Sequence, residues 1–343
     1  MSTVSLSPRA LMSLLVNASK AVDVLETALG MGLLDVLEPG PARLDELADR
    51  FGVRPLRLYK FLDCLESLGF VAREEPGDDI AEASYRAVPG LREAVVAVFG
   101  PASIERDRDR YPWQRLHGRL PGALRGEVGM TDDDFAWPPR TDEQTAAFER
   151  SMSAGVGPVV EVFGQHADRL WSGRRRLLDV GGGDGTLAAR ILADAPGLRA
   201  DVYNLPAVGP LVEQTRLGCV DPARLGFVAG DFLAEPLPDG YDTVSFVRVL
   251  HDWPGEVSRM LVEKAYAALP PGGQVLICEE FRTPDRLAVQ FFWTYFLIGV
   301  DTCVSRLREV SYYTDLLAEV GFEKPEVLPG GWELVVARKP ARP

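Results

Sequence analysis

Two kinds of hydrophobic spacing divide this chain. Up to about residue 92, apolar residues recur at three- and four-residue steps, as at Leu11, Leu14 and Leu15, which predicts amphipathic helices. From residue 177 onward, short apolar runs alternate with helical stretches, and the runs fall at 177–180, 200–203, 227–228, 243–247, 275–278 and 334–337. That alternation predicts an α/β fold with a largely parallel, doubly wound sheet, which binds ligands at the carboxyl ends of its strands.

The amino-terminal pattern indicates a winged helix. Two helical stretches, at 43–52 and 57–69, precede two short strand-like segments at 70–73 and 85–88. Winged helices often bind DNA, but Arg57 and Lys60 on the second helix stand beside Asp63 and Glu66, without a basic stripe for phosphates. We therefore expect this part to mediate dimerisation.

The amino-acid composition indicates which class of partner to expect. The 343 residues are 46% hydrophobic, and 50 acidic against 37 basic residues leave a net charge of −13, which repels nucleic acid and anionic membranes. Four widely spaced cysteines indicate reduced thiols. There is no leader pattern and no apolar run of about 20 residues, so we expect a cytoplasmic protein with a small-molecule partner.

A glycine-rich loop follows the first apolar run of the second half. Asp179 and Val180 lead into Gly181-Gly182-Gly183-Asp184-Gly185, which lets bare backbone approach a ligand. A dinucleotide fingerprint requires glycine at the sixth position, where Thr186 stands, so a nicotinamide cofactor is disfavoured. Asp184 repels phosphates but suits a cationic ligand such as a sulfonium.

Polar and aromatic residues follow three further apolar runs, where a ligand should lie. These segments are Asn204-Leu205-Pro206, Gly230-Asp231-Phe232 and Arg248-Val249-Leu250-His251-Asp252-Trp253. With Phe148 to Met152, Pro271-Gly272-Gly273 and residues 318–322, they resemble the class I S-adenosylmethionine-dependent methyltransferases. The resemblance is specifically to the small-molecule O-methyltransferases of the plant caffeate and bacterial polyketide type, and it covers almost the whole chain.

The resemblance implies a Rossmann-like doubly wound sheet preceded by a mostly helical, winged-helix dimerisation domain. We expect that domain at 1–100, a connector with linker helices contributing to the substrate pocket at 101–170, and an S-adenosylmethionine-binding catalytic domain at 171–343. The implied assembly is a homodimer. The implied reaction is O-methylation of an aromatic hydroxyl in specialised, antibiotic-type metabolism, with S-adenosylhomocysteine as the by-product.

The same resemblance assigns cofactor contacts. Gly181 and Gly183 would line the methionine end, and Asp231 and Phe232 would hold adenine. Asn204 stands where the family has a carboxylate for the ribose, and a neutral acceptor makes a weaker bond. The full expected set is Asp179, Gly181, Gly183, Asn204, Leu205, Gly230, Asp231, Phe232, Arg248 and Trp253.

His251 is the general base that the resemblance implies. An unperturbed pKa of about 6.5 would leave it mostly neutral at pH 7 and able to accept a phenol proton. Glu279, or Glu280 beside it, would orient the ring, and Asp252 completes the expected catalytic set. The expected substrate pocket comprises Trp113, Phe148, Met152, Phe292, Tyr295 and Phe296. No metal site is expected, because no second histidine lies near His251.

Two alternatives stay open. Ser305 replaces a second family glutamate, and some relatives methylate a carbon next to a carbonyl, as in 2-oxo acids. A winged-helix regulator with a degenerate enzyme domain is the more remote alternative, and the retained His251 opposes it.

Overall fold

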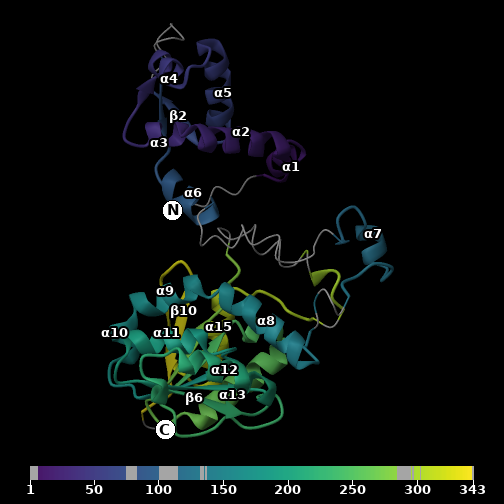
Figure 1. Ribbon diagram of the computed structural model, residues 1–343, viewed down its shortest axis with the longest axis vertical. Helices are drawn as coiled ribbons and strands as arrows, with labels where there is room; N and C mark the ends of the chain where they lie inside the picture. The colour runs from purple at the N-terminus through teal and green to yellow at the C-terminus, as the bar shows by residue number, and fades with distance from the viewer. Residues whose placement is uncertain are drawn as a thin grey trace. The chain divides into compact units, whose positions relative to one another are not determined.

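The computed structural model describes residues 7–74, 83–99, 115–131, 135, 137–283, 295, 297–301 and 303–341. Contacts divide the chain into two compact units, Met1–Ser103 and Ile104–Pro343. Figure 1 labels their elements. Within the described ranges, no helix is both long and apolar enough to cross a membrane.

The first unit is helical with a small antiparallel sheet. Its helices are α1 (Pro8–Val16), α2 (Ala18–Met31), α3 (Leu33–Leu37), α4 (Leu44–Phe51), α5 (Pro55–Ser67) and α6 (Leu91–Phe99). The strands β1 (Ala42–Arg43), β2 (Val71–Glu74) and β3 (Ser84–Ala87) pair in the order β1-β3-β2. Gly52 ends α4 at φ 63°, and Pro55 starts α5, so glycine and proline set the turn between these helices. The helix, turn, helix and wing expected from the sequence are present.

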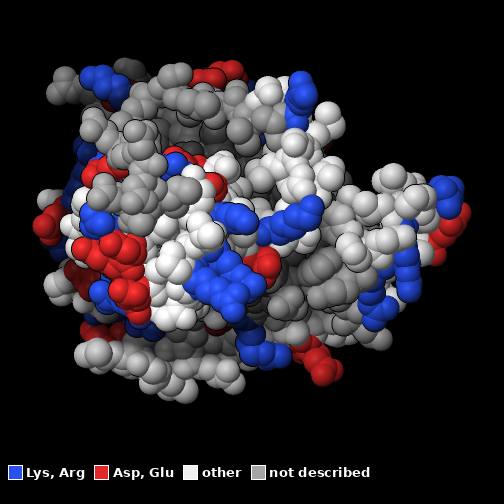
Figure 2. All heavy atoms as spheres, turned by 90° about the horizontal axis from the view of Figure 1, so that it is seen from above, with Lys and Arg blue, Asp and Glu red and all other residues white. Residues whose placement is uncertain are grey.

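Charges on the first unit are mixed. Arg73 on β2 forms ion pairs with Asp63 and Glu66 of α5. The face drawn in Figure 2 carries both basic and acidic side chains. The pairing of Arg73 with two carboxylates weakens the positive potential that phosphates need, which disfavours the regulator alternative.

The second unit contains a seven-stranded sheet in the order β6-β5-β4-β7-β8-β10-β9. The strands are β4 (Arg176–Val180), β5 (Arg199–Asn204), β6 (Leu225–Ala229), β7 (Thr243–Val247), β8 (Gln274–Cys278), β9 (Glu323–Leu328) and β10 (Leu334–Arg338). Only β10 runs antiparallel to its neighbours. The predicted doubly wound α/β class is confirmed.

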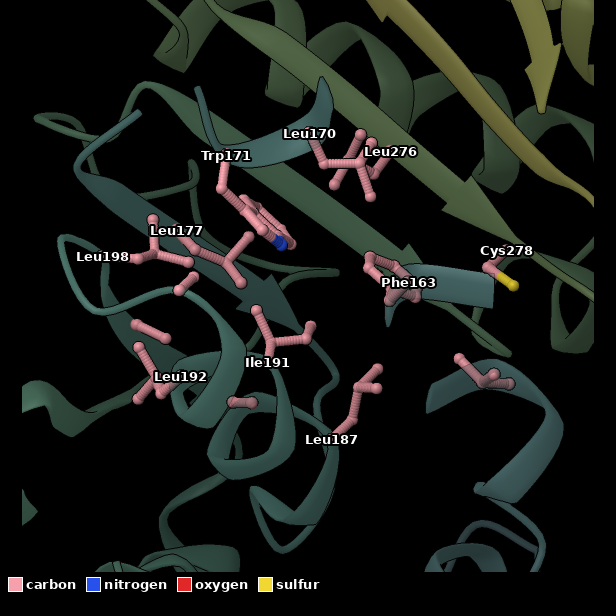
Figure 3. Close-up of a cluster of buried hydrophobic side chains, with 14 of the residues drawn as sticks. Phe163, Leu170, Trp171, Leu177, Leu187, Ile191, Leu192, Leu198, Leu276 and Cys278 are labelled. Atoms are coloured by element: carbon pink, nitrogen blue, oxygen red, sulfur yellow. The ribbon is translucent and has the colours of Figure 1, made fainter. Parts of the chain in front are cut away.

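Helices cover both faces of this sheet, because its strands are apolar on both sides. Leu177 packs with α9 (Gly157–Gln165), α10 (Ala167–Trp171) and α11 (Thr186–Asp194), in the cluster drawn in Figure 3. Leu178 faces the other way, toward α13 (Gly255–Ala268) and α15 (Val310–Val320). The remaining helices are α7 (Leu120–Ala123), α8 (Asp142–Ala154) and α12 (Gly209–Leu217).

The strand order reverses beside β4. The chain passes from β4 to β5 and β6 on one side and then returns to place β7 on the other. Such a switch point opens a crevice at the carboxyl ends of the strands. The glycine loop after β4 and the His251 segment after β7 therefore meet at this edge.

Candidate active site

The loop after β4 turns through the left-handed region three times. Gly181, Gly183 and Gly185 have φ of 69°, 57° and 81°. A residue with a Cβ is strained in that region, which accounts for the glycines. Asp184 Oδ1 then accepts from the Thr186 backbone N–H at 3.0 Å, and α11 begins at Thr186.

Protein side chains occupy the space that these glycines leave. A Cβ on Gly181 would lie 2.8 Å from Val249 Cγ2, and one on Gly183 would lie 2.7 Å from Glu149 Oε2. A Cβ on Gly182 would lie 2.3 Å from Asp179 Oδ2. The bare backbone was expected to let a ligand approach, and it also leaves room for side chains from β4, α8 and the segment after β7.

Asp179, the last residue but one of β4, has one carboxylate oxygen in a hydrogen bond and one without a partner among the described residues. Its Oδ1 accepts from Ser245 Oγ at 2.6 Å, whereas the buried Oδ2 has no hydrogen-bond partner within the described residues. Burial raises the pKa of Asp179 to about 6, against the opposing effect of the Ser245 hydrogen bond. An unsatisfied carboxylate oxygen beside a cavity favours a ligand that donates or carries positive charge.

A cavity of about 450 Å³ runs along these strand ends. The loops after β4, β5, β6 and β7 line it together with α8 and the residues before it. Its ionisable lining residues are Arg140, Asp142, Glu149, Asp179, Asp184, Asp231, Arg248 and Asp252. Six carboxyl groups against two guanidinium groups suit a ligand with a sulfonium and an ammonium group, so the residues present fit S-adenosylmethionine.

The ends of β5 and β6 contribute polar groups to the same cavity. Asn204 Oδ1 already accepts from the Leu205 backbone N–H at 2.8 Å, so one lone pair remains for a ribose hydroxyl. Asp231 Oδ1 accepts from Leu233 N–H at 2.8 Å. Lys264 of α13 donates to the Phe232 carbonyl at 2.8 Å and fixes this loop.

Aromatic rings form one wall. Phe232 meets Trp253 edge to face with centroids 5.9 Å apart, and Trp253 lies 6.3 Å from Trp137. Trp137 in turn lies 5.0 Å from Phe148 of α8. Trp137 was not among the predicted pocket residues, although the sequence shows it in a Trp-Pro-Pro segment before α8.

His251 is held by a carboxylate on each side of its ring. Nδ1 contacts Glu279 Oε2, and Nε2 lies 3.3 Å from Asp252 Oδ1. Glu279 Oε1 accepts from the backbone N–H groups of Val249 and Leu250 at 3.0 and 2.8 Å. The side chain paired with the ring is therefore Glu279, the first of the two glutamates considered.

The expectation that His251 is mostly neutral at pH 7 needs correction. Burial lowers its pKa, but the charges of Asp252 and Glu279 outweigh burial and raise the pKa to about 9, so the ring is protonated at pH 7. Within the described residues, Asp252 lines the cavity and His251 does not; His251 is 8% exposed. Asp252 thus contacts both the ring and the cavity, and Ser305 Oγ donates to its Oδ1 at 2.8 Å.

Most of the other predicted site residues line the cavity, and a few do not. All the expected cofactor contacts line the cavity except Gly230, where a Cβ would lie 2.4 Å from the Tyr203 ring. Gly230 therefore makes room for Tyr203. Phe148 and Met152 line the cavity and Tyr295 does not, while Trp113, Phe292 and Phe296 lie outside the described residues.

Glu149 is a further cavity residue that was not among the predicted site residues. It is 7% exposed, and burial followed by the charge of Asp184 raises its pKa to about 7, with Arg248 opposing. The sequence did contain a signal, because Glu149 falls three residues before Met152 and therefore on the same face of α8.

Arg248 joins α8 to the end of β7. Its Nη1 donates to the Met152 carbonyl at 2.9 Å, and its backbone adopts φ 57°, which is uncommon for a residue with a side chain. No group of three or more His, Cys, Asp or Glu side chains among the described residues could hold a metal ion.

Comparisons with known proteins agree with this geometry. Residues 107–323 match the model of a family described as the O-methyltransferase domain. The chain is 29% identical to N,N-dimethyltransferase OxyT of Streptomyces rimosus over 99% of this chain and 100% of that protein. It is 28% identical to the tetracenomycin polyketide synthesis 8-O-methyl transferase TcmO of Streptomyces glaucescens, over 92% of each. The apo crystal structure of the S-adenosylmethionine-dependent methyltransferase SibL shares the fold, with a TM-score of 0.64, 22% identity and 96% and 99% coverage of the two chains.

The charge state of His251 can be measured directly. We expect its imidazole to titrate with a pKa near 9 in the NMR spectrum, and Glu279→Gln to lower that pKa, because one of the two flanking negative charges is lost. Glu280→Gln is the matched control and should leave it nearly unchanged. Titration of wild-type His251 near its ordinary pKa of about 6.5 would contradict this account of the site.

Proposed function

The chain belongs to the O-methyltransferase domain family, and from that premise we propose that it methylates a hydroxyl group on an aromatic small molecule of specialised, antibiotic-type metabolism. It is an S-adenosylmethionine-dependent methyltransferase. The observation that carries the proposal is the cavity lined from the glycine loop to Asp252, with His251 Nε2 3.3 Å from Asp252 Oδ1. The aromatic rings of Trp137, Phe148 and Trp253 suit a flat acceptor.

The residues that would hold the cofactor follow the strand ends. The backbone at Gly181 and Gly183 would line its amino-acid end, Asn204 would accept from a ribose hydroxyl, and Asp231 with Phe232 would bind adenine. S-adenosylmethionine, when bound, supplies an electrophilic methyl group on a sulfonium. The acidic lining would attract the positive charges of this cofactor and so favour its binding.

His251 is proposed as the group on which the acceptor proton ends. Because Asp252 lines the cavity and His251 does not, the hydroxyl would first meet Asp252, and the proton would pass to Nε2, 3.3 Å from Asp252 Oδ1. A conjugate acid of pKa about 9 makes neutral His251 a stronger base than an ordinary histidine, and closer to a phenol of pKa about 10. At pH 7, however, only about one His251 ring in a hundred is neutral and able to accept the proton.

A second copy of the chain is the proposed partner. Helix α1 exposes Met12, Leu15 and Val16. Apolar side chains gathered on one helix favour an interface, and the resemblance assigns dimerisation to this part of the chain. The proposal is a homodimer formed through the first unit.

Methylation of a carbon next to a carbonyl is the second candidate. The observation that favours it is Ser305, which donates to Asp252 where the family has a glutamate. A hydroxyl leaves one negative charge fewer beside the acceptor than a glutamate would, and so changes the base available there.

Offering acceptors of different chemistry distinguishes these reactions. We expect mass spectrometry to detect methyl transfer to oxygen when polycyclic phenols, aromatic amines and 2-oxo acids are supplied side by side with S-adenosylmethionine. Transfer only to carbon of the 2-oxo acids would contradict the preferred proposal, and so would transfer only to the amine nitrogen.

The pH dependence tests His251. Its raised pKa means that the base form is scarce below pH 9, so the rate should rise about tenfold per pH unit between 7 and 8 and level off above about 9. His251→Ala should lose about a hundredfold or more in rate and lose this rise, whereas a rise caused by ionisation of the acceptor would persist in the variant. A rate that falls above pH 9 would mean that protonated His251 is required, and would remove it as the base.

Light scattering tests the assembly. We expect twice the chain mass for the wild type and a shift toward monomer for Leu15→Glu, since a buried interface charge is costly. Val220→Glu is the matched control, because Val220 is a fully exposed apolar residue of the second unit. A monomeric wild type would contradict the proposed homodimer.

A further inference from the structure

Glu149 is a buried carboxylate that no hydrogen bond described above satisfies. It sits on α8, whose start is fixed by Thr141 Oγ1 accepting from Gln144 N–H at 3.2 Å. The side chain is 7% exposed, lines the cavity, and places Oε2 directly over the backbone of Gly183. A carboxyl group in this position is desolvated and faces the ligand space, so its negative charge is costly until a cation arrives.

The groups around Glu149 leave it available for a ligand. Asp184 is the other carboxylate acting on it, and that side chain caps α11 through Thr186 N–H. Arg248 is the nearby cation, but its guanidinium donates to the Met152 carbonyl and sulfur at 2.9 and 2.6 Å. The remaining charged groups that line the cavity are Arg140, Asp142, Asp179, Asp231 and Asp252. No described cation forms an ion pair with Glu149.

We propose that Glu149 is the counter-ion for the α-ammonium group of S-adenosylmethionine and S-adenosylhomocysteine. This rests on the cofactor assignment given above, in which the loop from Gly181 to Gly183 faces the amino-acid end. The carboxylate over Gly183 then meets the ammonium at the point where the backbone approaches closest. In that assignment the ribose and adenine ends would lie against Asn204 at the end of β5 and Asp231 after β6.

Binding of an ammonium group beside Glu149 should release protons from the protein. With a pKa of about 7, Glu149 is half protonated in the free protein at pH 7. Binding of an ammonium group favours the charged carboxylate and lowers that pKa, so about half a proton is released per ligand bound. Affinity should therefore fall as the pH drops below 7, because the proton competes with the ligand.

Calorimetry tests the proposal with two ligands at pH 7, in phosphate and in Tris buffer. S-adenosylhomocysteine should release about half a proton from the wild type, read from the buffer dependence of the binding heat. 5′-Methylthioadenosine, which lacks the amino-acid end, should release almost none. Glu149→Gln should abolish the proton release and lower the affinity for S-adenosylhomocysteine by about tenfold or more. The affinity for 5′-methylthioadenosine should stay unchanged.

Glu143→Gln is the matched control, since Glu143 is an exposed glutamate on the same helix, and it should behave like the wild type. Equal proton release with both ligands, or no release with either, would overturn the proposal from wild-type data alone. An equal loss of affinity for both ligands in Glu149→Gln would also overturn the proposal, because it would indicate that Glu149 has a structural role. Failure of the wild type to bind S-adenosylhomocysteine would instead refute the cofactor assignment itself.

Discussion

The left-handed turn after β4 is the constraint on which the rest of the site depends. Because Gly181, Gly182 and Gly183 carry no Cβ, the loop can pack against Val249, Asp179 and Glu149 while still lining the cavity. A side chain at any of these positions would push apart β4, α8 and the segment after β7. The same turn starts α11, which covers the sheet. Ligand binding and packing of the fold thus share one stretch of backbone.

The second determinant is the charge balance around His251. Two carboxylates flank one imidazole in a buried place, so the ring keeps its proton at pH 7 although burial opposes this. Glu279 is fixed by two backbone N–H groups and in turn orients the ring. Asp252 forms the face toward the cavity, and Ser305 holds it there. In the proposed reaction, His251 and Asp252 would act as a coupled pair, with Asp252 on the side of the cavity.

The sequence predicted the parts of the molecule that local pattern encodes. Apolar runs predicted six strands of the large sheet. They did not predict the edge strand β9, because Glu323–Leu328 is mostly exposed and polar. Motif order predicted the pairing of His251 with a glutamate, but the pKa of about 9 depends on two charges brought together from β8 and the same loop. Glu149 escaped because an acidic residue on a helix is ordinarily solvated, and only the position of α8 over the glycine loop makes it a cavity residue.

A crystal structure with S-adenosylhomocysteine would test the central claim, that one cavity holds the cofactor along the ends of β4, β5 and β6 and presents its sulfur toward Asp252. The account predicts the amino-acid end against the loop from Gly181 to Gly183, the ribose at Asn204 and the adenine beside Phe232. A ligand bound in the opposite direction, with adenine on the glycine loop, would contradict it. So would a ligand bound outside this cavity.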